Sequence, residues 1–158
     1  MSDAILIDAV RPEDREVVAD LFLADLDTVR VRKTRAEVLA VIDSLIEGTR
    51  PHELFWAART APGGRPLGAL LATVVTSVKH GGRALWLEQL FVDGSARRMG
   101  AGRAMVERLL SWCRENGVVG IDLESYQLNA PASCLYRSLG FRRLGRERFT
   151  IDLTATDA

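Results

Sequence analysis

The hydrophobic positions in the first third of the chain predict a short strand followed by two helices. Residues 4–10 are mostly apolar and predict the strand. Helical spacing then places four apolar residues on one face: Val17, Val18, Leu21 and Phe22. A second helix is predicted from Thr34 to Gly48. Thr34 and Glu37 form the T-x-x-E pattern of a capping box at the start of this helix. Apolar residues then recur on one helical face until Gly48, where the helix should end.

In the middle of the chain the periodicity changes to that of strands. Three stretches rich in apolar and β-branched residues, 52–60, 67–79 and 84–92, are separated by short Gly-rich turns. Short turns of this kind join antiparallel neighbours, so these three strands should form a meander.

Helical spacing returns after residue 100 and is followed by another apolar stretch. The helix presents one apolar face, made of Met105, Val106, Leu109, Leu110 and Cys113. Asn116 and Gly117 then provide a helix stop. Residues 118–124 predict a fifth strand. The intervening helix should place this strand parallel to the strand 84–92.

The last part of the chain predicts a short helix over 129–140 and two closing strands within 141–153, turning at Gly145. The predicted fold is therefore a single α/β domain over residues 1–158. Its mixed sheet begins with antiparallel strands and continues with a parallel strand–helix–strand unit.

Composition narrows the possible classes of function. Charged residues make up 27% of the chain and cancel to a net charge of zero, which argues against a nucleic-acid-binding protein. Neither the two cysteines nor the two histidines have metal-ligand spacing, so we expect no metal and no disulfide framework. The acidic N-terminus lacks the basic start of a signal peptide, and no apolar run is long enough to span a bilayer. We therefore expect a cytoplasmic protein that does not bind membranes.

The stretch ARRMGAGRAM, residues 96–105, joins the strand 84–92 to the helix after it. A helix N-terminus carries unpaired N–H groups and partial positive charge, and glycine lets a ligand approach the backbone. Gly100 and Gly102 at this position therefore indicate an anion site, with phosphate as the usual ligand. A dinucleotide-binding G-x-G-x-x-G would need glycine in place of Met105, and the G-K-[ST] of a P-loop is absent. Taken alone, the two glycines are equally compatible with a tight strand-to-helix corner.

Two segments resemble the GNAT superfamily of N-acetyltransferases. Arg97-x-x-Gly100-x-Gly102 matches the R/Q-x-x-G-x-G/A signature of that superfamily, with a strand before it and a helix after it. The segment NAPASCLYRSLGF, residues 129–141, resembles its N-x-x-A/S-x-x-F/L-Y-x-x-x-G-F segment. The order of predicted elements is also similar to the GNAT fold.

The resemblance implies acetyl-CoA as the cosubstrate. It implies that the pyrophosphate lies on the glycine turn, formed by Arg97, Arg98, Met99, Gly100, Ala101, Gly102 and Arg103. The pantetheine arm would pair with the backbone of Leu90, Phe91 and Val92, where the two parallel strands splay apart. The resemblance also implies a cofactor contact for Asn129. Many members of the superfamily have glycine where this chain has Arg98.

Glu88 is the candidate general base. Together with Gln89 it interrupts the apolar strand 84–92, and an interior carboxylate is costly to bury unless it is paired or neutralised. Such a carboxylate can take a proton from an ammonium acceptor. The alternative is an ion pair with one of the many arginines. The stretch LEQLFV, residues 87–92, also resembles the matching stretch of diamine and thialysine acetyltransferases, in which the Glu at this position lies near the amine. This resemblance favours a small amine acceptor.

Tyr136 is the candidate general acid. The helical pattern alone predicts only a packed aromatic side chain. The Tyr of the matching GNAT segment commonly protonates the departing coenzyme thiolate, so the resemblance implies that role for Tyr136.

The sequence therefore predicts direct acetyl transfer from acetyl-CoA to a small primary amine. Cys113 and Cys134 lie on predicted helices with no base nearby in sequence, which argues against a covalent acetyl-enzyme. A homodimer is expected, because related proteins often dimerise and late strands would leave a sheet edge. Two alternatives stay open: transfer to a protein N-terminus or lysine, and a non-catalytic acyl-CoA-binding sensor or assembly module.

Overall fold

The computed structural model describes residues 4–48 and 50–154. The chain divides after Tyr126 into two compact parts. Among the described residues, the first part contains the sheet and three α-helices, and the second contains one further α-helix.

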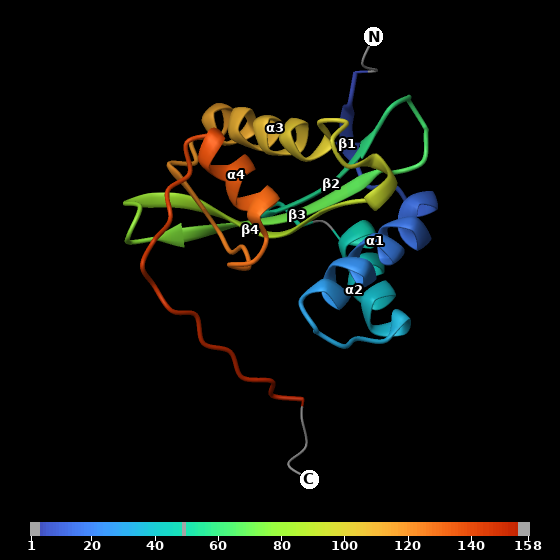
Figure 1. Cartoon of the computed structure of the whole chain (residues 1–158), viewed down its shortest axis with the longest axis horizontal. Helices are drawn as coiled ribbons and strands as arrows, with labels where there is room; N and C mark the ends of the chain where they lie inside the picture. Colours follow the sequence, from blue (N-terminus) through green and yellow to red (C-terminus); the bar gives the residue numbers. More distant parts are fainter. Residues whose placement is uncertain (1–3, 49, 155–158) are drawn as a thin grey trace. The chain divides into compact units, whose positions relative to one another are not determined.

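The first part is built on a five-stranded sheet with the strand order β1-β2-β3-β4-β5 (Figure 1). The strands are β1 (Leu6–Ala9), β2 (Glu53–Arg59), β3 (Gly68–Ser77), β4 (Gly82–Val92) and β5 (Gly120–Leu123). Neighbours from β1 to β4 pair antiparallel, whereas β5 runs parallel to β4. The predicted meander and the predicted parallel unit are both confirmed.

Helices cover both faces of this sheet. One side carries α1 (Arg15–Thr28), which follows the short 3-10 helix η1 (Pro12–Asp14), and α2 (Arg35–Glu47). The other side carries α3 (Ala101–Glu115), as Figure 1 shows. The predicted capping box begins α2, with Glu37 N donating to Thr34 Oγ1 at 3.2 Å and Thr34 N donating to Glu37 Oε2 at 2.7 Å.

Successive side chains of each strand point to opposite faces of the sheet, so apolar side chains are buried on both faces. On the α1–α2 side, the ring of Phe22 lies 6.1 Å from the ring of Phe55, in a group that also contains Phe91. On the other side, Met105 of α3 is fully buried, and the Arg108 guanidinium lies 5.4 Å from the centre of the Trp56 ring. Burial of each large apolar side chain stabilises the fold by roughly 1.5–3 kcal/mol.

A buried ion pair fastens η1 to the sheet. Arg59 of β2 is fully buried, and its NH2 group donates to Asp14 Oδ2 at 3.0 Å. Arg59 Nε also donates to Asp8 Oδ1 at 2.8 Å, while Arg11 donates to Asp14 from the exposed side. Burial alone would raise the pKa of Asp14. The hydrogen bonds from Arg59 and Arg11 outweigh that effect and hold this pKa below its usual range.

The second part contains α4 (Ala130–Ser138), which confirms the predicted last helix. The two closing strands predicted within residues 141–153 are not present, because residues 141–154 form neither a strand nor a bridge. The apolar residues that suggested the second of these strands are highly exposed, at 85% for Phe149, 79% for Ile151 and 87% for Leu153. Their alternation fits a strand, but a strand requires a hydrogen-bonded partner, and the described chain provides none here.

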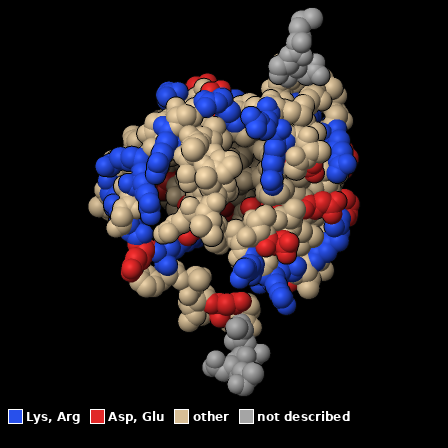
Figure 2. Space-filling model, viewed as in Figure 1, with Lys and Arg blue, Asp and Glu red and all other residues tan. Residues whose placement is uncertain are grey.

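The described ranges contain no helix long and apolar enough to cross a membrane. Acidic and basic side chains are interspersed on the face seen in Figure 2, in keeping with the net charge of zero.

Candidate functional site

The turn between β4 and α3 has an unusual backbone. The 3-10 helix η2 (Gly94–Ala96) follows β4, and Asp93 Oδ1 caps it by accepting from Ser95 N at 2.8 Å. Arg98 then has a φ of 68° and Gly100 a φ of 84°. Both values lie in the left-handed region, which glycine adopts freely and arginine adopts at a cost. This explains why glycine suits the position that Arg98 occupies here.

The N-terminus of α3 opens at this turn. Gly100 is the N-cap residue and supplies no side-chain cap, so the first N–H groups of α3 have no partner within the helix. A Cβ built on Gly100 would meet nothing within 4 Å, so the space beside the turn is open. Open space, unpaired N–H groups and the positive end of a helix are the features that bind phosphate.

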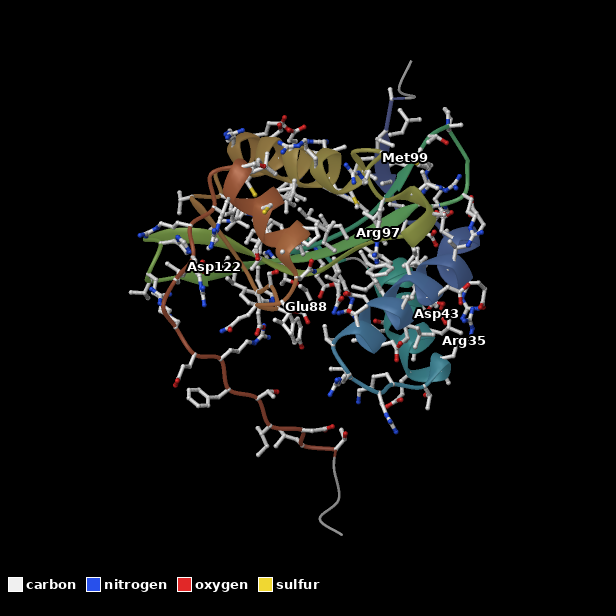
Figure 3. All side chains as sticks on the ribbon, viewed as in Figure 1. Arg35, Asp43, Glu88, Arg97, Met99 and Asp122 are labelled. Carbon is white, nitrogen blue, oxygen red and sulfur yellow. The ribbon has the colours of Figure 1, made fainter. Side chains whose placement is uncertain are left out.

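The three arginines of the turn differ in their surroundings. The Arg97 guanidinium lies 5.8 Å from the centre of the Phe91 ring, which fixes it beside β4 (Figure 3). Arg103 NH1 lies 3.5 Å from Glu107 Oε1, one helical turn away. Arg98 and Met99 are exposed. The turn is therefore positively charged and open to solvent.

Strands β4 and β5 part close to this turn. Their last paired residues are Leu87 and Leu123, whereas β4 continues to Val92. The backbones of Leu90, Phe91 and Val92 pair only with β3. Just beyond β5, the hydroxyl of Ser125 is buried with no hydrogen-bond partner in the described structure. An unpaired strand edge and an orphaned buried hydroxyl fit a ligand with amide groups, such as the pantetheine arm.

Glu88 lies where the two strands part. Leu71 of β3 pairs with Gln89 and Ala72 pairs with Leu87, so Glu88 is the extra residue of a β-bulge. The expectation of an interior, buried carboxylate is wrong, because Glu88 is exposed at the point where β5 stops pairing with β4. Its Oε2 accepts a hydrogen bond of 2.5 Å from Trp86 Nε1, so the partner of this carboxylate is an indole and not an arginine.

Tyr136 lies in α4, and Asn129 immediately precedes that helix. Tyr136 is half-buried, and its ring contacts the ring of Phe141 edge-on at 5.7 Å between centroids. Asn129 is the N-cap residue of α4, and its Oδ1 accepts from Ala132 N at 3.3 Å. Within the first part of the chain, the structure brings together the glycine turn, the open edge of β4 and Glu88.

Two further features of this region are the indole of Trp86 and the carboxyl group of Asp25. Trp86 holds the Glu88 carboxylate, and its position two residues earlier on the same strand was the available signal. Asp25 lies half-buried on the apolar stripe of α1, the helix that packs against β3 and β4. Burial raises the pKa of Asp25 to about 6.

The cysteines differ in exposure. Cys113 is buried in α3 and Cys134 is exposed on α4, and neither forms a disulfide. Burial raises the pKa of the Cys113 thiol to about 11, which keeps it protonated at neutral pH.

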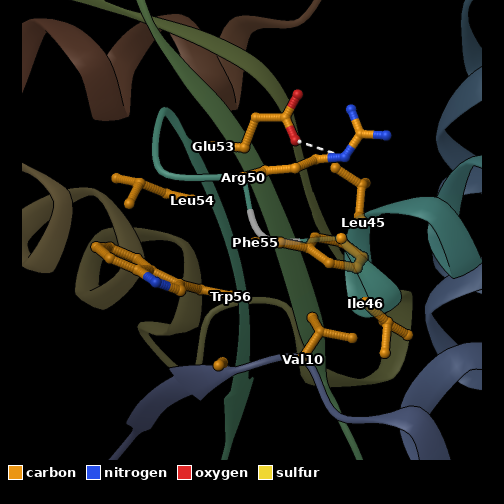
Figure 4. Close-up of a pocket in the computed structure, with 10 residues that line it drawn as sticks. Val10, Leu45, Ile46, Arg50, Glu53, Leu54, Phe55 and Trp56 are labelled. Carbon is orange, nitrogen blue, oxygen red and sulfur yellow. Dashed lines mark ion pairs between the residues drawn. The ribbon is translucent and has the colours of Figure 1, made fainter.

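A cavity of about 270 Å³ lies elsewhere, between the end of α2 and the start of β2 (Figure 4). Apolar side chains including Val10, Ile46 and Phe55 line it, together with the Arg50–Glu53 ion pair at 3.5 Å. None of the predicted site residues lines this cavity. Within the described ranges, no three His, Cys, Asp or Glu side chains are grouped to hold a metal ion.

Together, the mixed sheet, the parallel strands that part and the glycine turn at the start of α3 define an acetyltransferase fold. The sequence matches the acetyltransferase (GNAT) family over residues 18–141, which is most of the chain. The chain therefore belongs to the GNAT family.

Similar proteins agree with this assignment. N-acetyltransferase 8F1 of Rattus norvegicus is 30% identical over 63% of this chain, and N-acetyltransferase 8 of Homo sapiens is 30% identical over 61%. The matched regions cover only 44% and 42% of those relatives.

Solved structures share the fold at lower identity. A possible acetyltransferase from Clostridium difficile 630 has a TM-score of 0.79 and 18% identity, and the match covers 96% of this chain and 99% of that one. AAC(6')-Iy in complex with a bisubstrate analogue, CoA-S-monomethyl-acetylneamine, has a TM-score of 0.73 and 17% identity, with 94% and 98% covered.

Proposed function

We propose that this chain is an acetyl-CoA-dependent N-acetyltransferase that moves the acetyl group directly to a small primary amine. One observation carries the proposal: the left-handed glycine turn opens beside a β4 edge that β5 leaves unpaired, in a chain of the GNAT family. A phosphate site and an amide-binding strand edge next to each other suit the two halves of coenzyme A.

The donor occupies the turn and the strand edge. The pyrophosphate accepts hydrogen bonds from the N–H groups of the turn, residues 97–103, with charge support from Arg98 and Arg103. The pantetheine arm pairs with the backbone of Leu90, Phe91 and Val92, as a further strand would. This arrangement leads the thioester toward Glu88, at the point where β4 and β5 part.

Glu88 acts as the base, directly or through one water. An alkylammonium acceptor has a pKa of about 10, so it must lose a proton before its nitrogen can attack the acetyl carbonyl. Glu88 is exposed, so its carboxylate can reach an acceptor or a water molecule. The Trp86 N–H donates a hydrogen bond to one carboxylate oxygen and holds it in place. The first proton passes through Glu88 to solvent.

Tyr136 acts as the acid. The new C–N bond forms as the C–S bond breaks, and the departing thiolate takes a proton from the Tyr136 hydroxyl. The amide nitrogen gives up its second proton, which restores the phenol. In total the ammonium loses two protons, of which one ends on the coenzyme thiol and one in solvent. Asn129 is proposed as a further coenzyme contact.

The chemistry of Cys113 supports direct transfer. A thiol nucleophile reacts as its thiolate, and burial keeps Cys113 protonated. The preference for a small amine rests on the resemblance of LEQLFV and on AAC(6')-Iy, whose bisubstrate analogue joins CoA to an acetylneamine.

We also propose a homodimer in the cytoplasm. Among the described residues, β5 is the last strand on its side of the sheet, and the edge strand of a sheet favours pairing with a second copy. Both cysteines are unpaired, as is usual in a reducing compartment. Light scattering of the purified protein tests the dimer, since a monomer at micromolar concentration would refute it.

The experiment that tests the function follows release of the coenzyme thiol from acetyl-CoA with a panel of amines. The panel contains diamines, polyamines, thialysine, lysine, aminoglycosides and peptides with free N-termini. Release that requires a small amine supports the proposal. Release only with peptides points to a protein acceptor, and bound acetyl-CoA without release from any amine points to a binding module.

A further inference from the structure

The cavity between α2 and β2 has the size and lining of a ligand site. Its volume is about 270 Å³. Apolar side chains from the end of α2 and the start of β2 line it, together with the residue that follows β1 (Figure 4); they include Val10, Leu45, Ile46 and Phe55. An apolar cavity of about 150 Å³ is large enough to bind benzene. This cavity can therefore take a small organic molecule.

One carboxylate oxygen in the lining lacks a hydrogen bond. Glu53 and Phe55 lie two residues apart on β2, so their side chains share one face of the sheet. Glu53 Oε2 is buried and finds no hydrogen-bond donor among the described residues. A buried acceptor without a donor is costly, and more so when it belongs to a charged group. Such an atom in a cavity wall points to a donor that the described chain does not itself supply.

Arg50 balances the charge of Glu53 without hydrogen-bonding to it. Arg50 Nε lies 3.5 Å from Glu53 Oε2, but its N–H donates to the carbonyl of Ser44 at 3.2 Å. Gly48 permits this arrangement, because a Cβ there would lie 2.7 Å from Ser44 O and 2.9 Å from Arg50 Nε. The carboxylate would repel an anion and the guanidinium would repel a cation. An uncharged donor therefore fits this end of the cavity best.

From these contacts we infer that the cavity between α2 and β2 binds a compact, apolar, uncharged molecule with one hydroxyl or N–H group, which donates to Glu53 Oε2. The apolar body of the ligand packs against Ile46 and Phe55. The Arg50 side chain is 46% exposed, so solvent reaches the end of the site that Arg50 and Glu53 form. None of the residues proposed to bind acetyl-CoA lines the cavity, so this is a separate site. The inference does not depend on the proposed function.

Two probes of similar shape test the need for a donor. Phenol carries a hydroxyl group, whereas anisole carries a methyl ether that accepts a hydrogen bond but cannot donate one. NMR titration of the full chain measures both affinities. We expect phenol to bind about 10–100-fold more tightly than anisole, as for the loss of a hydrogen bond to a charged group. Equal affinities overturn the inference. Absence of binding by either probe also overturns it, because the cavity would then hold water alone.

The same titration and two variants locate the binding. The amide signals of Ile46 and Phe55 should shift when phenol is added, and unchanged signals would contradict the inference even if no variant folds. Ile46→Phe reduces the volume of the cavity and should weaken phenol binding at least about 10-fold. Glu53→Met removes the acceptor at similar volume, so phenol and anisole should then bind within about 3-fold of each other.

Glu115→Met at the end of α3 is the matched control for the loss of a glutamate, and it should leave both affinities unchanged. Phenol affinity that neither Ile46→Phe nor Glu53→Met alters would place the binding elsewhere and overturn the inference.

Discussion

The indole N–H of Trp86 donates a hydrogen bond of 2.5 Å to Oε2 of Glu88, two residues further along β4. The contact follows from the alternation of side chains along a strand, which places residues 86 and 88 on the same face. The bond leaves one carboxylate oxygen for a substrate and fixes the direction in which it points.

Trp86→Phe should therefore impair catalysis without removing the base. Loss of a hydrogen bond to a charged group costs about 1.5–3 kcal/mol, so kcat/KM for the amine should fall roughly 10–100-fold. The KM for acetyl-CoA should stay unchanged. Trp112→Phe on α3 is the matched control. An unaltered kcat/KM in Trp86→Phe would show that the indole does not position Glu88.

Glu88→Gln should lower turnover most strongly at neutral pH. We expect kcat to fall about 10²–10⁴-fold at pH 7, because the proposed mechanism assigns removal of the ammonium proton to Glu88. The deficit should shrink as the pH approaches about 10, where an alkylamine loses its proton unaided. A pH–rate profile parallel to that of the wild type would exclude Glu88 as the base.

Tyr136→Phe should lower kcat by about 10²–10⁴-fold while leaving acetyl-CoA affinity nearly intact. The variant keeps the ring that packs on Phe141 and removes only the hydroxyl. A donor thioester whose leaving thiol is more acidic should be much less sensitive to the substitution, because it needs less help from an acid. Equal losses with both donors would argue for a structural role.

Asp14→Asn should destabilise the fold by about 3–5 kcal/mol, because it leaves Arg59 buried without its main charge partner. The pKa of Asp14 is lowered in the folded state, so its stabilisation is present above the unfolded pKa of about 4 and is lost as pH falls below it. Urea titrations from pH 7 to pH 3 should show a weaker acid dependence in the variant. Parallel curves for variant and wild type would refute the role of this pair.

Asp25→Asn should have the opposite effect. The pKa of Asp25 is raised to about 6 by burial, so its ionised form opposes folding. Wild-type stability should therefore decline as pH rises from about 4 to about 6, and at pH 7 the variant should be more stable by roughly 1–3 kcal/mol. Below pH 4 the two should converge. Asp27→Asn, at an exposed position two residues on, is the control, and an Asp25→Asn that gains nothing at pH 7 contradicts the assignment.

Much of the fold follows from periodicity and turn chemistry. The capping box at Thr34 predicted the start of α2, and the order of strand, helix and strand predicted that β5 runs parallel to β4. The capping box depends on residues close together in sequence, and the parallel pairing follows from a general rule of handedness. Both can therefore be predicted from the sequence.

Other features depend on register and partners, which the sequence does not display. Glu88 is exposed where the ladder between β4 and β5 ends, and only the pairing of the two strands shows where that end lies. The left-handed backbone at Arg98 has no glycine to signal it. Alternating apolar residues at Phe149, Ile151 and Leu153 predicted a strand wrongly, because alternation does not supply a pairing partner.

The most direct test of the account follows the acetyl group itself. The protein is incubated with acetyl-CoA carrying a deuterated acetyl group and with the best amine of the panel, and both the amine and the intact protein are analysed by mass spectrometry. The account predicts that the label appears in the amine in an amount equal to the thiol released, with none on the protein. Label retained on Cys113 or Cys134, or bound acetyl-CoA that labels no amine, would contradict direct transfer.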